Sequence, residues 1–264
     1  MRIFDFNSAI VRMPGRSVVD GLRANGGPAP SFEGVQREHQ GYVAALLDAG
    51  VQVIELEPLE QFPDSIFVED PALVFSQAAI VLRPGAPSRM AEARELVPVL
   101  EQRFGTVLQL NAGFADGGDI LVTPREVLIG ISARTDAQGA RALQGLLAST
   151  GLASRVVRVP PGTLHLKTDC SLVDEETVLA TAGMAASGVL AGYRVLTVPA
   201  SERAATNAVR VNDRVLIRAG SPRTQEMLAR HGIDAISLPV DEIGRIDAGL
   251  SCMSLRWFDA AMSR

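Results

Sequence analysis

Short apolar runs and polar turns alternate along this chain in a pattern that repeats. Four stretches, which begin near Glu69, Gly117, Lys167 and Ala205, each place a polar residue ahead of a short apolar run. A polar turn follows, and then a second run rich in Val, Ile and Leu, which together predict a β-hairpin. The hairpin therefore recurs four times.

Helical periodicity follows three of the hairpins, whereas the third hairpin leads into a stretch of small residues. The segments 87–105, 135–151 and 222–232 begin near Ser, Thr or Asp and end at glycine, as helices do. The predicted unit is strand, turn, strand, helix, strand, and its period of roughly 40–50 residues is typical of repeat architectures. The closing apolar runs are 107–110, 154–160 and 233–240.

The two ends of the chain supply a fifth unit. Segment 250–258 is its first strand, 8–15 its second, and 36–58 its helix and third strand. Pairing of the terminal strands would close a ring and remove free sheet edges. We therefore expect one catalytic domain, residues 1–264, folded as a five-bladed α/β propeller of pseudo-symmetric ββαβ units. An open α/β sheet without symmetry is the alternative.

Composition excludes several classes of protein. The chain has 264 residues, 47% hydrophobic and 21% charged, which suits a soluble enzyme with a sizeable core. A formal charge of −5 without a basic run argues against nucleic-acid binding. No apolar run approaches the ~20 residues of a membrane helix, and no signal peptide is recognisable. We expect a cytoplasmic protein.

The chain contains two cysteines, Cys170 and Cys252, so neither a disulfide framework nor a cysteine zinc site is expected. Each comes at the start of a predicted strand. A free cysteine is more often a small buried hydrophobe than a nucleophile, so other residues must separate the two.

If the units surround a common axis, the starts of their first strands meet at one end of it. A cysteine nucleophile needs a neighbouring histidine or cation to favour its thiolate, and a carboxylate to orient that histidine. Two other histidines are expected to be structural, His39 on a helix surface and His231 at a helix end. The residues brought together are Cys252, His165, Asp116, Glu69 and Asp70, and Asp119 flanks the start of the second unit.

Acids and arginines complete the candidate site. Asp64, Glu69 and Asp70 lie within seven residues and favour a pocket that receives a cation. Arg89 and Arg134 offer guanidinium forks for a carboxylate. A ligand with one cationic and one carboxylate end is an amino acid of the arginine type.

At these residues the sequence resembles the dimethylarginine dimethylaminohydrolase family of the guanidino-group-modifying enzymes. The resemblance extends from about residue 17 to residue 256, and implies the pentein fold, which is a five-bladed α/β propeller. The matching stretches are SVVDGL, FPDSIFVEDP, RPGAPSR, DGGDI, SARTDAQGA, LHLKTD and GLSCMSLR.

The resemblance implies roles for these residues. Cys252 would attack the guanidinium carbon and expel dimethylamine or methylamine, and water activated by His165 would release citrulline from the S-alkylthiouronium. Asp116 would be the third catalytic member. Among substrate-binding residues, Asp70 would hold the guanidinium nitrogens, and Asp64 and the neighbourhood of Glu69 would meet the α-amino group. Arg89 and Arg134 would hold the α-carboxylate. The backbone at Leu22 would line the lid over the pocket. No metal or organic cofactor is expected.

One departure concerns Met90, because relatives often have a second arginine there after Arg89. A glycine- and proline-rich segment, 23–34, is expected to form the lid.

Three alternatives remain open. An arginine deiminase-type hydrolase would act on unmethylated arginine, a binding protein would use the pocket without turnover, and an amidinotransferase would pass the amidino group to an amine. The expected partner is a small-molecule substrate, methylated arginine, with neither nucleic acid nor membrane involved, and a homodimer stays open.

Overall fold

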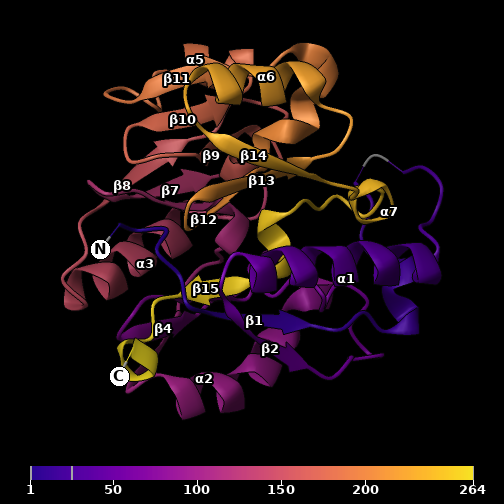
Figure 1. Ribbon diagram of the computed structural model, residues 1–264. Helices are drawn as coiled ribbons and strands as arrows, with labels where there is room; N and C mark the ends of the chain where they lie inside the picture. Colours follow the sequence, from indigo (N-terminus) through magenta and orange to yellow (C-terminus); the bar gives the residue numbers. More distant parts are fainter. Residues whose placement is uncertain (1, 25, 264) are drawn as a thin grey trace.

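The computed structural model describes residues 2–24 and 26–263, and these contain five separate three-stranded sheets with one connectivity (Figure 1). In each sheet a short first strand pairs antiparallel with a second strand. The second strand pairs parallel with a third strand that follows a crossover. Five repeated α/β units are thus confirmed.

Four units are continuous in the chain, and the fifth joins its two ends. The continuous units are β3 (Ala72–Val74), β4 (Ala78–Val81) and β5 (Thr106–Gln109); β6 (Ile120–Val122), β7 (Val127–Ile131) and β8 (Ser154–Arg158); β9 (Cys170–Leu172), β10 (Thr177–Ala180) and β11 (Arg194–Thr197); β12 (Val209–Val211), β13 (Arg214–Arg218) and β14 (Asp234–Leu238). The fifth is β15 (Leu255–Trp257), β1 (Ser8–Arg12) and β2 (Gln52–Leu56), in which Ser8 lies opposite Trp257 and Gln52.

The hydrophobic pattern of each strand follows its place in the sheet. Second strands are covered on both faces, so β4 and β10 are buried throughout and read as the apolar runs AAIV and TVLA. Third strands lie at the outer edge. In β2 and β14 exposed and half-buried positions mix, and the runs QVIEL and DAISL carry charged or polar residues accordingly.

The predicted segment 87–105 is broken into three pieces. α3 begins after Asp136, whose carboxylate accepts from the Gly139 amide at 2.6 Å. The helices are α1 (Phe32–Asp48), α2 (Val97–Arg103), α3 (Ala137–Ser149), α4 (Leu166–Asp169), α5 (Ala182–Ala186), α6 (Pro222–Arg230) and α7 (Asp241–Gly244). The 3-10 helices are η1 (Arg16–Asp20), η2 (Pro87–Arg89), η3 (Glu92–Leu96), η4 (Gly117–Asp119), η5 (Ala200–Thr206), η6 (Ser251–Met253) and η7 (Ala260–Ser263).

Five apolar clusters form the core, and each combines two sheets that are consecutive in the chain order of the units. One cluster joins Ile80 of β4 to Ile129 of β7, and another joins Leu128 of β7 to Val178 of β10. A third joins Leu216 of β13 to Val11 of β1, so the last continuous unit packs against the unit made of both termini. The remaining two clusters connect β10 with β13 and β1 with β4.

Helix α1 corrects one prediction. His39 was expected at the surface but is only 2% exposed. It shares the buried face of α1 with Val35, Tyr42, Val43 and Leu46, which lie at helical spacing on either side of it. Burial without a compensating acid lowers the pKa of His39 to about 4.

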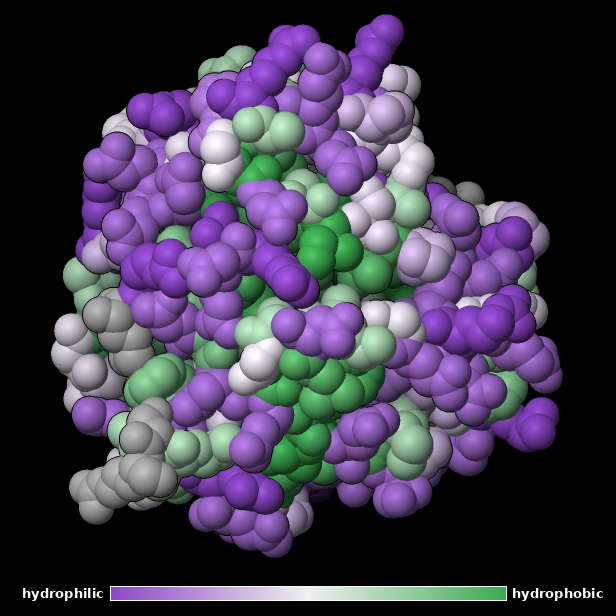
Figure 2. Space-filling model, in the orientation of Figure 1, coloured by the Kyte–Doolittle hydropathy of each residue, from purple (hydrophilic) through white to green (hydrophobic). Residues whose placement is uncertain are grey.

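Most side chains on the face shown in Figure 2 are hydrophilic, and a hydrophobic area lies near its centre, where Figure 1 draws β1, β2 and β15. No helix among residues 2–24 and 26–263 is long and apolar enough to cross a membrane.

Adjacent leucines on α1 test this packing. Leu46 is fully buried and Leu47 is 55% exposed. We predict that Leu46→Ala lowers the free energy of unfolding by about 2–5 kcal/mol, because it leaves a cavity, whereas Leu47→Ala changes it by about 0.5 kcal/mol or less. Urea denaturation followed by circular dichroism measures both, and equal losses would contradict the assigned burial.

Candidate active site

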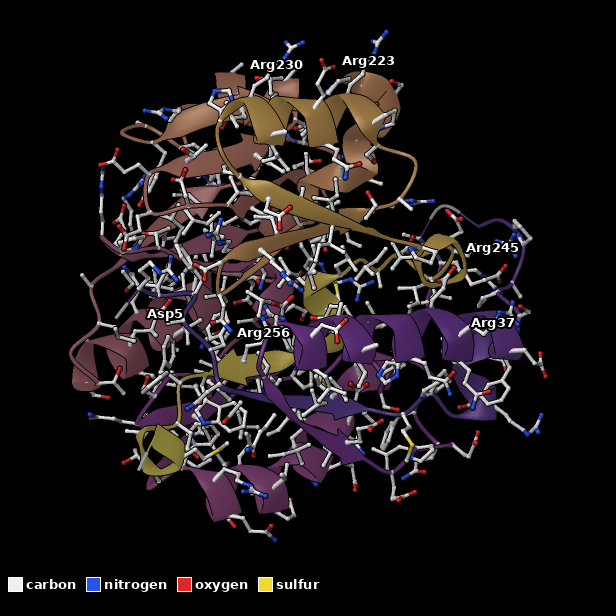
Figure 3. The ribbon with its side chains drawn as sticks, in the orientation of Figure 1. Asp5, Arg37, Arg223, Arg230, Arg245 and Arg256 are labelled. Atoms are coloured by element: carbon white, nitrogen blue, oxygen red, sulfur yellow. The ribbon has the colours of Figure 1, made fainter. Side chains whose placement is uncertain are left out.

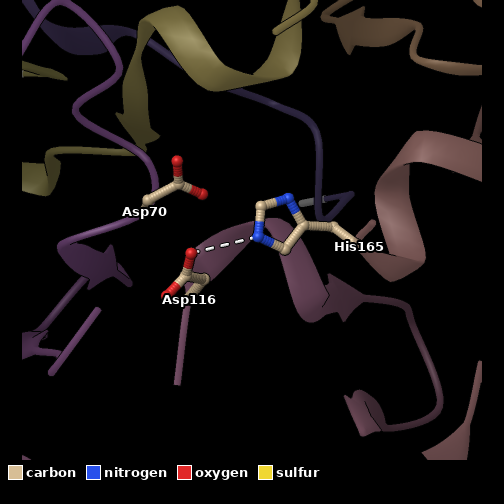
Figure 4. A group of neighbouring side chains, drawn as sticks. All are labelled: Asp70, Asp116 and His165. Carbon is tan, nitrogen blue, oxygen red and sulfur yellow. Dashed lines mark hydrogen bonds and ion pairs between the residues drawn. The ribbon is translucent and has the colours of Figure 1, made fainter. Parts of the chain in front are cut away.

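The predicted site residues precede the first strands of different units. Asp70 comes two residues before β3, Asp116 precedes η4 and β6, and His165 precedes α4 and β9. One carboxylate oxygen of Asp70, one of Asp116 and one ring nitrogen of His165 all lie within 4.8 Å of one another (Figure 4). Cys252 adjoins the group, because its carbonyl accepts from the amide of Glu69 at 3.2 Å. The expected convergence of strand starts is therefore present.

Asp116 and His165 form a buried hydrogen-bonded pair. Nε2 of His165 lies 3.0 Å from Oδ2 of Asp116, whose side chain is fully buried (Figure 4). Oδ1 of Asp116 accepts from the Gly85 amide at 2.7 Å. Both carboxylate oxygens are thus engaged, which fixes the orientation of the carboxylate and of the imidazole bonded to it.

Charge decides the protonation state of His165. Burial alone would lower its pKa, but the hydrogen bond to Asp116 and the charges of Asp70, Asp119 and Asp116 outweigh burial. Together they raise the pKa of His165 to about 9. At neutral pH the imidazole is therefore a cation, able to donate a proton.

Two glycines allow this close packing. A Cβ on Gly117 would lie 1.9 Å from the carbonyl oxygen of Glu69, and a Cβ on Gly118 would lie 2.8 Å from the ring of His165. The two glycines of the motif DGGD therefore allow the backbone to lie close to Glu69 and His165.

Cys252 lies within η6 and not, as expected, at the start of a strand; β15 begins three residues later. The side chain is partly exposed. Burial is the largest cause that raises the pKa of its thiol to about 12, and the charges of Asp70 and Glu69 add to it. The charge of Lys167 opposes this shift weakly. Without ligand the thiol is neutral.

Arg89, expected to hold a ligand carboxylate, is already paired with acids in the structure. Its guanidinium is 4% exposed and donates to Asp70, to both oxygens of Glu92 and to the carbonyls of Asp64 and Phe67. Arg89 therefore holds a buried acid cluster in this state and is not presented to a ligand carboxylate. The neighbouring charge of Arg89 keeps the pKa of Asp70 below its ordinary value in spite of burial.

Glu69, expected near an α-amino group, is also engaged. It forms an ion pair with Lys167, accepts from the Ser251 hydroxyl at 2.8 Å and lies 3.5 Å from Arg256. Sequence reasoning missed Lys167 and Glu92 as partners of the acids. Lys167 follows His165 by two residues in the sequence. A single lysine so close to the candidate histidine was the signal that predicts a buried acid opposite it.

Asp64, Leu22 and Arg134 form the remaining part. The Leu22 amide donates to Asp64 at 2.9 Å. Burial raises the pKa of Asp64, although Arg89 and, more weakly, Arg134 oppose the shift. Among the described residues, the Arg134 guanidinium has neither a carboxylate partner nor a hydrogen bond.

Asp70, Asp116 and His165 have metal-ligating atoms close together. However, Asp70 already accepts from the Gly118 amide at 3.1 Å and from Arg89, and Asp116 accepts from Gly85 and His165. The set therefore fits an acid–imidazole pair better than an open metal site.

Comparison with known proteins agrees with this geometry. An arginine deiminase family model matches residues 100–215. A dimethylarginine dimethylaminohydrolase of Pseudomonas aeruginosa is 40% identical over 96% of this chain and all of its own, and one of Streptomyces coelicolor is 32% identical over 94% of this chain and 96% of its own.

Solved structures extend the likeness. The Pseudomonas aeruginosa enzyme, as a Cys-to-Ser mutant with citrulline, superimposes with a TM-score of 0.92 at 37% identity over 96% of this chain and all of its own. The N-terminal domain of the cyanobacterial arginine dihydrolase ArgZ, at 20% identity and a TM-score of 0.85 over 96% of this chain and 97% of its own, shares the pentein-type fold. The chain belongs to the dimethylarginine dimethylaminohydrolase family.

Proposed function

We propose that this protein hydrolyses Nω-methylated arginine to citrulline and dimethylamine or methylamine. The observation that carries the proposal is the buried Asp116–His165 pair beside Cys252, with the carboxylates of Asp70 and Glu69 near the thiol. These acids suit a cationic guanidinium. The relatives from Pseudomonas and Streptomyces carry the same activity in their names.

The first half of the reaction forms a thiouronium. A guanidinium beside Asp70 and Glu69 would offset the carboxylates that raise the pKa of the thiol, so substrate binding favours the Cys252 thiolate, and the thiol proton passes to solvent water. The sulfur then bonds to the guanidinium carbon. As the C–N bond breaks, protonated His165 donates its proton to the leaving amine.

Hydrolysis completes the cycle. Neutral His165 takes one proton from water as the water oxygen attacks the thiouronium carbon. The C–S bond then breaks and the remaining hydroxyl proton passes to the sulfur, which releases citrulline and restores the neutral thiol. Asp116 keeps the imidazole oriented through both steps. No metal or organic cofactor is required for these two steps.

Substrate recognition uses the ends of the pocket. We assign the α-carboxylate to Arg134, whose guanidinium is unpaired among the described residues, and the α-amino group to Asp64 and the neighbourhood of Glu69. Arg89 would reach the carboxylate only after exchanging its bonds with Glu92. The Leu22 backbone would line the lid, segment 23–34. In this segment the Ser31 amide donates to the Glu242 carboxylate at 2.7 Å. Asn25 lies outside the described residues.

We also propose that the five sheets close a propeller within one catalytic domain. The support is packing, because each apolar cluster joins consecutive units, and two clusters join the unit made of both termini to the last and to the first continuous unit.

Arginine deiminase-type hydrolysis is the second candidate, favoured by the family model over residues 100–215. The chemistry at Cys252 would be the same with ammonia as the leaving group.

The two cysteines make a matched test. We predict that Cys252→Ala lowers citrulline release from asymmetric dimethylarginine by more than about 1,000-fold, whereas Cys170→Ala, in a buried apolar cluster, retains activity. Citrulline and dimethylamine are measured, with arginine in parallel. Turnover of arginine alone would favour the deiminase, and an active Cys252→Ala would contradict the assigned nucleophile.

The pH profile tests His165. Because the free enzyme needs the imidazolium, kcat/KM should fall as pH rises through about 9. Asp116→Asn replaces the carboxylate whose hydrogen bond raises this pKa most strongly, so the fall should begin at lower pH. Asp48→Asn on the exposed end of α1 is the control. An alkaline limb that stays in place in Asp116→Asn would refute the role of the pair.

A further inference from the structure

A cavity of about 720 Å³ extends from Glu69 and Lys167 along the first strands of all five units. The catalytic residues precede these strands, whereas the cavity continues to the hairpin turns at their far ends, including 75–77 and 123–126. Glu69, Lys167 and Ser251 border it, and Cys252, His165 and Asp116 do not. The cavity thus adjoins the proposed active site at Glu69 without containing the three catalytic residues, and its volume lies in the range of ligand pockets.

Apolar side chains make up much of its wall, including Leu73, Leu121 and Trp257. Two phenylalanines of the N-terminal segment carry cations at their faces. The guanidinium carbons of Arg2 and Arg210 lie 5.2 and 5.0 Å from the ring centre of Phe4, and that of Arg256 lies 6.0 Å from the ring of Phe6.

Cations exceed acids in this cavity although the whole chain is acidic. Its acids are already paired: Asp5 with Arg2 at 2.8 Å, Glu126 with Arg155 at 2.9 Å, and Glu69 with Lys167. The lining cations are Arg2, Arg125, Lys167, Arg210 and Arg256, and the lining acids are Asp5, Glu69 and Glu126.

Arg125 and Arg210 have no carboxylate partner within the described part of the chain. Arg125 donates to the Gly192 carbonyl at 2.8 Å, and Arg210 donates to the carbonyls of Asn212 and Val173 at 2.7 and 3.1 Å. These bonds and the stacked rings hold the guanidinium groups in place and leave N–H donors free.

We propose that this cavity binds a small organic anion, one that has an aromatic or aliphatic body and a carboxylate. The apolar strands would cover the body, and Arg210 with Arg125 would receive the anionic group. The ligand contacts proposed for this cavity do not involve Cys252, His165 or Asp116.

Titration calorimetry with 1-naphthoate tests the site. We expect one molecule bound, at least about 10-fold weaker binding in Arg210→Gln, and no competition by citrulline. Arg223→Gln is the matched control, because Arg223 projects from α6 away from the body of the protein (Figure 3). Arg125→Gln is a second variant, and circular dichroism checks that each one folds.

Neutral 1-naphthylmethanol should bind more weakly than 1-naphthoate. The proposal is overturned if 1-naphthoate does not bind at millimolar concentration, binds Arg210→Gln and Arg125→Gln as well as the parent, or is displaced by citrulline.

A second observation concerns Asp119, which is fully buried and has both oxygens occupied. Oδ1 accepts from the Leu166 amide at 2.8 Å. Oδ2 accepts from the hydroxyls of Ser132 and Thr135 at 2.6 and 2.7 Å. The Thr135 hydroxyl in turn accepts from the Asp116 amide at 3.1 Å. One carboxylate thus fixes the backbone next to His165 and, through Thr135, that of Asp116.

We infer that Asp119 is a positioning residue for the Asp116–His165 pair, an inference that rests on the proposed function. The charge of Asp119 also contributes to the raised pKa of His165. Loss of that charge would therefore alter both the orientation and the titration of the imidazole.

Asp119→Asn preserves size and removes the charge. We expect kcat to fall at least about 10-fold with KM changed less than about twofold, and the alkaline limb of kcat/KM to move to lower pH. Glu202→Gln is the matched control, since Glu202 is buried and accepts from two backbone amides and a hydroxyl outside the site. Both variants should lose stability, but only the first should move the profile.

Titration of the His165 imidazole by NMR tests the positioning role of Asp119 separately from the proposed function, because the titration needs no substrate. A lower pKa in Asp119→Asn supports positioning even if methylated arginine is not the substrate. An unchanged pKa with unchanged kcat would reduce Asp119 to a structural acid.

Discussion

The fold depends on one constraint: each three-stranded sheet has two apolar faces and cannot cover them alone. Its second strand is buried over most of its length, and throughout in β1, β4 and β10, so both faces need neighbours. Packing of consecutive units meets this need through five clusters. The same packing brings the strand starts together, and the candidate site lies where they meet.

Electrostatics at these strand starts follows from burial. Asp70, Asp116 and Asp119 are almost fully buried, and a buried charge must be paired or hydrogen-bonded. Asp70 has Arg89, Asp116 has His165, and Asp119 has amide and hydroxyl donors. The charges of these acids raise the pKa of His165, and burial together with the charge of Asp70 raises the pKa of the Cys252 thiol. The resting site therefore favours a cationic ligand near the sulfur.

The repeat, its strands and the convergence of Cys252, His165 and Asp116 were predictable, because period and polar strand starts are local features of the sequence. The partners of individual charges were not. Arg89 and Arg134 look alike in sequence, yet only the fold places Glu92 and Asp70 around the first. His39 was misjudged although its spacing from Val35 and Leu46 matched a buried face. The local structure at Cys252 was missed because η6 is a single turn that has no distinct pattern.

The proposed reaction requires that Cys252 bonds to the guanidinium carbon during turnover. The most direct measurement is mass spectrometry of protein quenched in acid while it processes asymmetric dimethylarginine, followed by peptide mapping. We expect an adduct equal to the substrate less dimethylamine, confined to the peptide that contains Cys252. Turnover with no adduct at Cys252 in the presteady or steady state, or an adduct on another residue, would contradict this role of the cysteine.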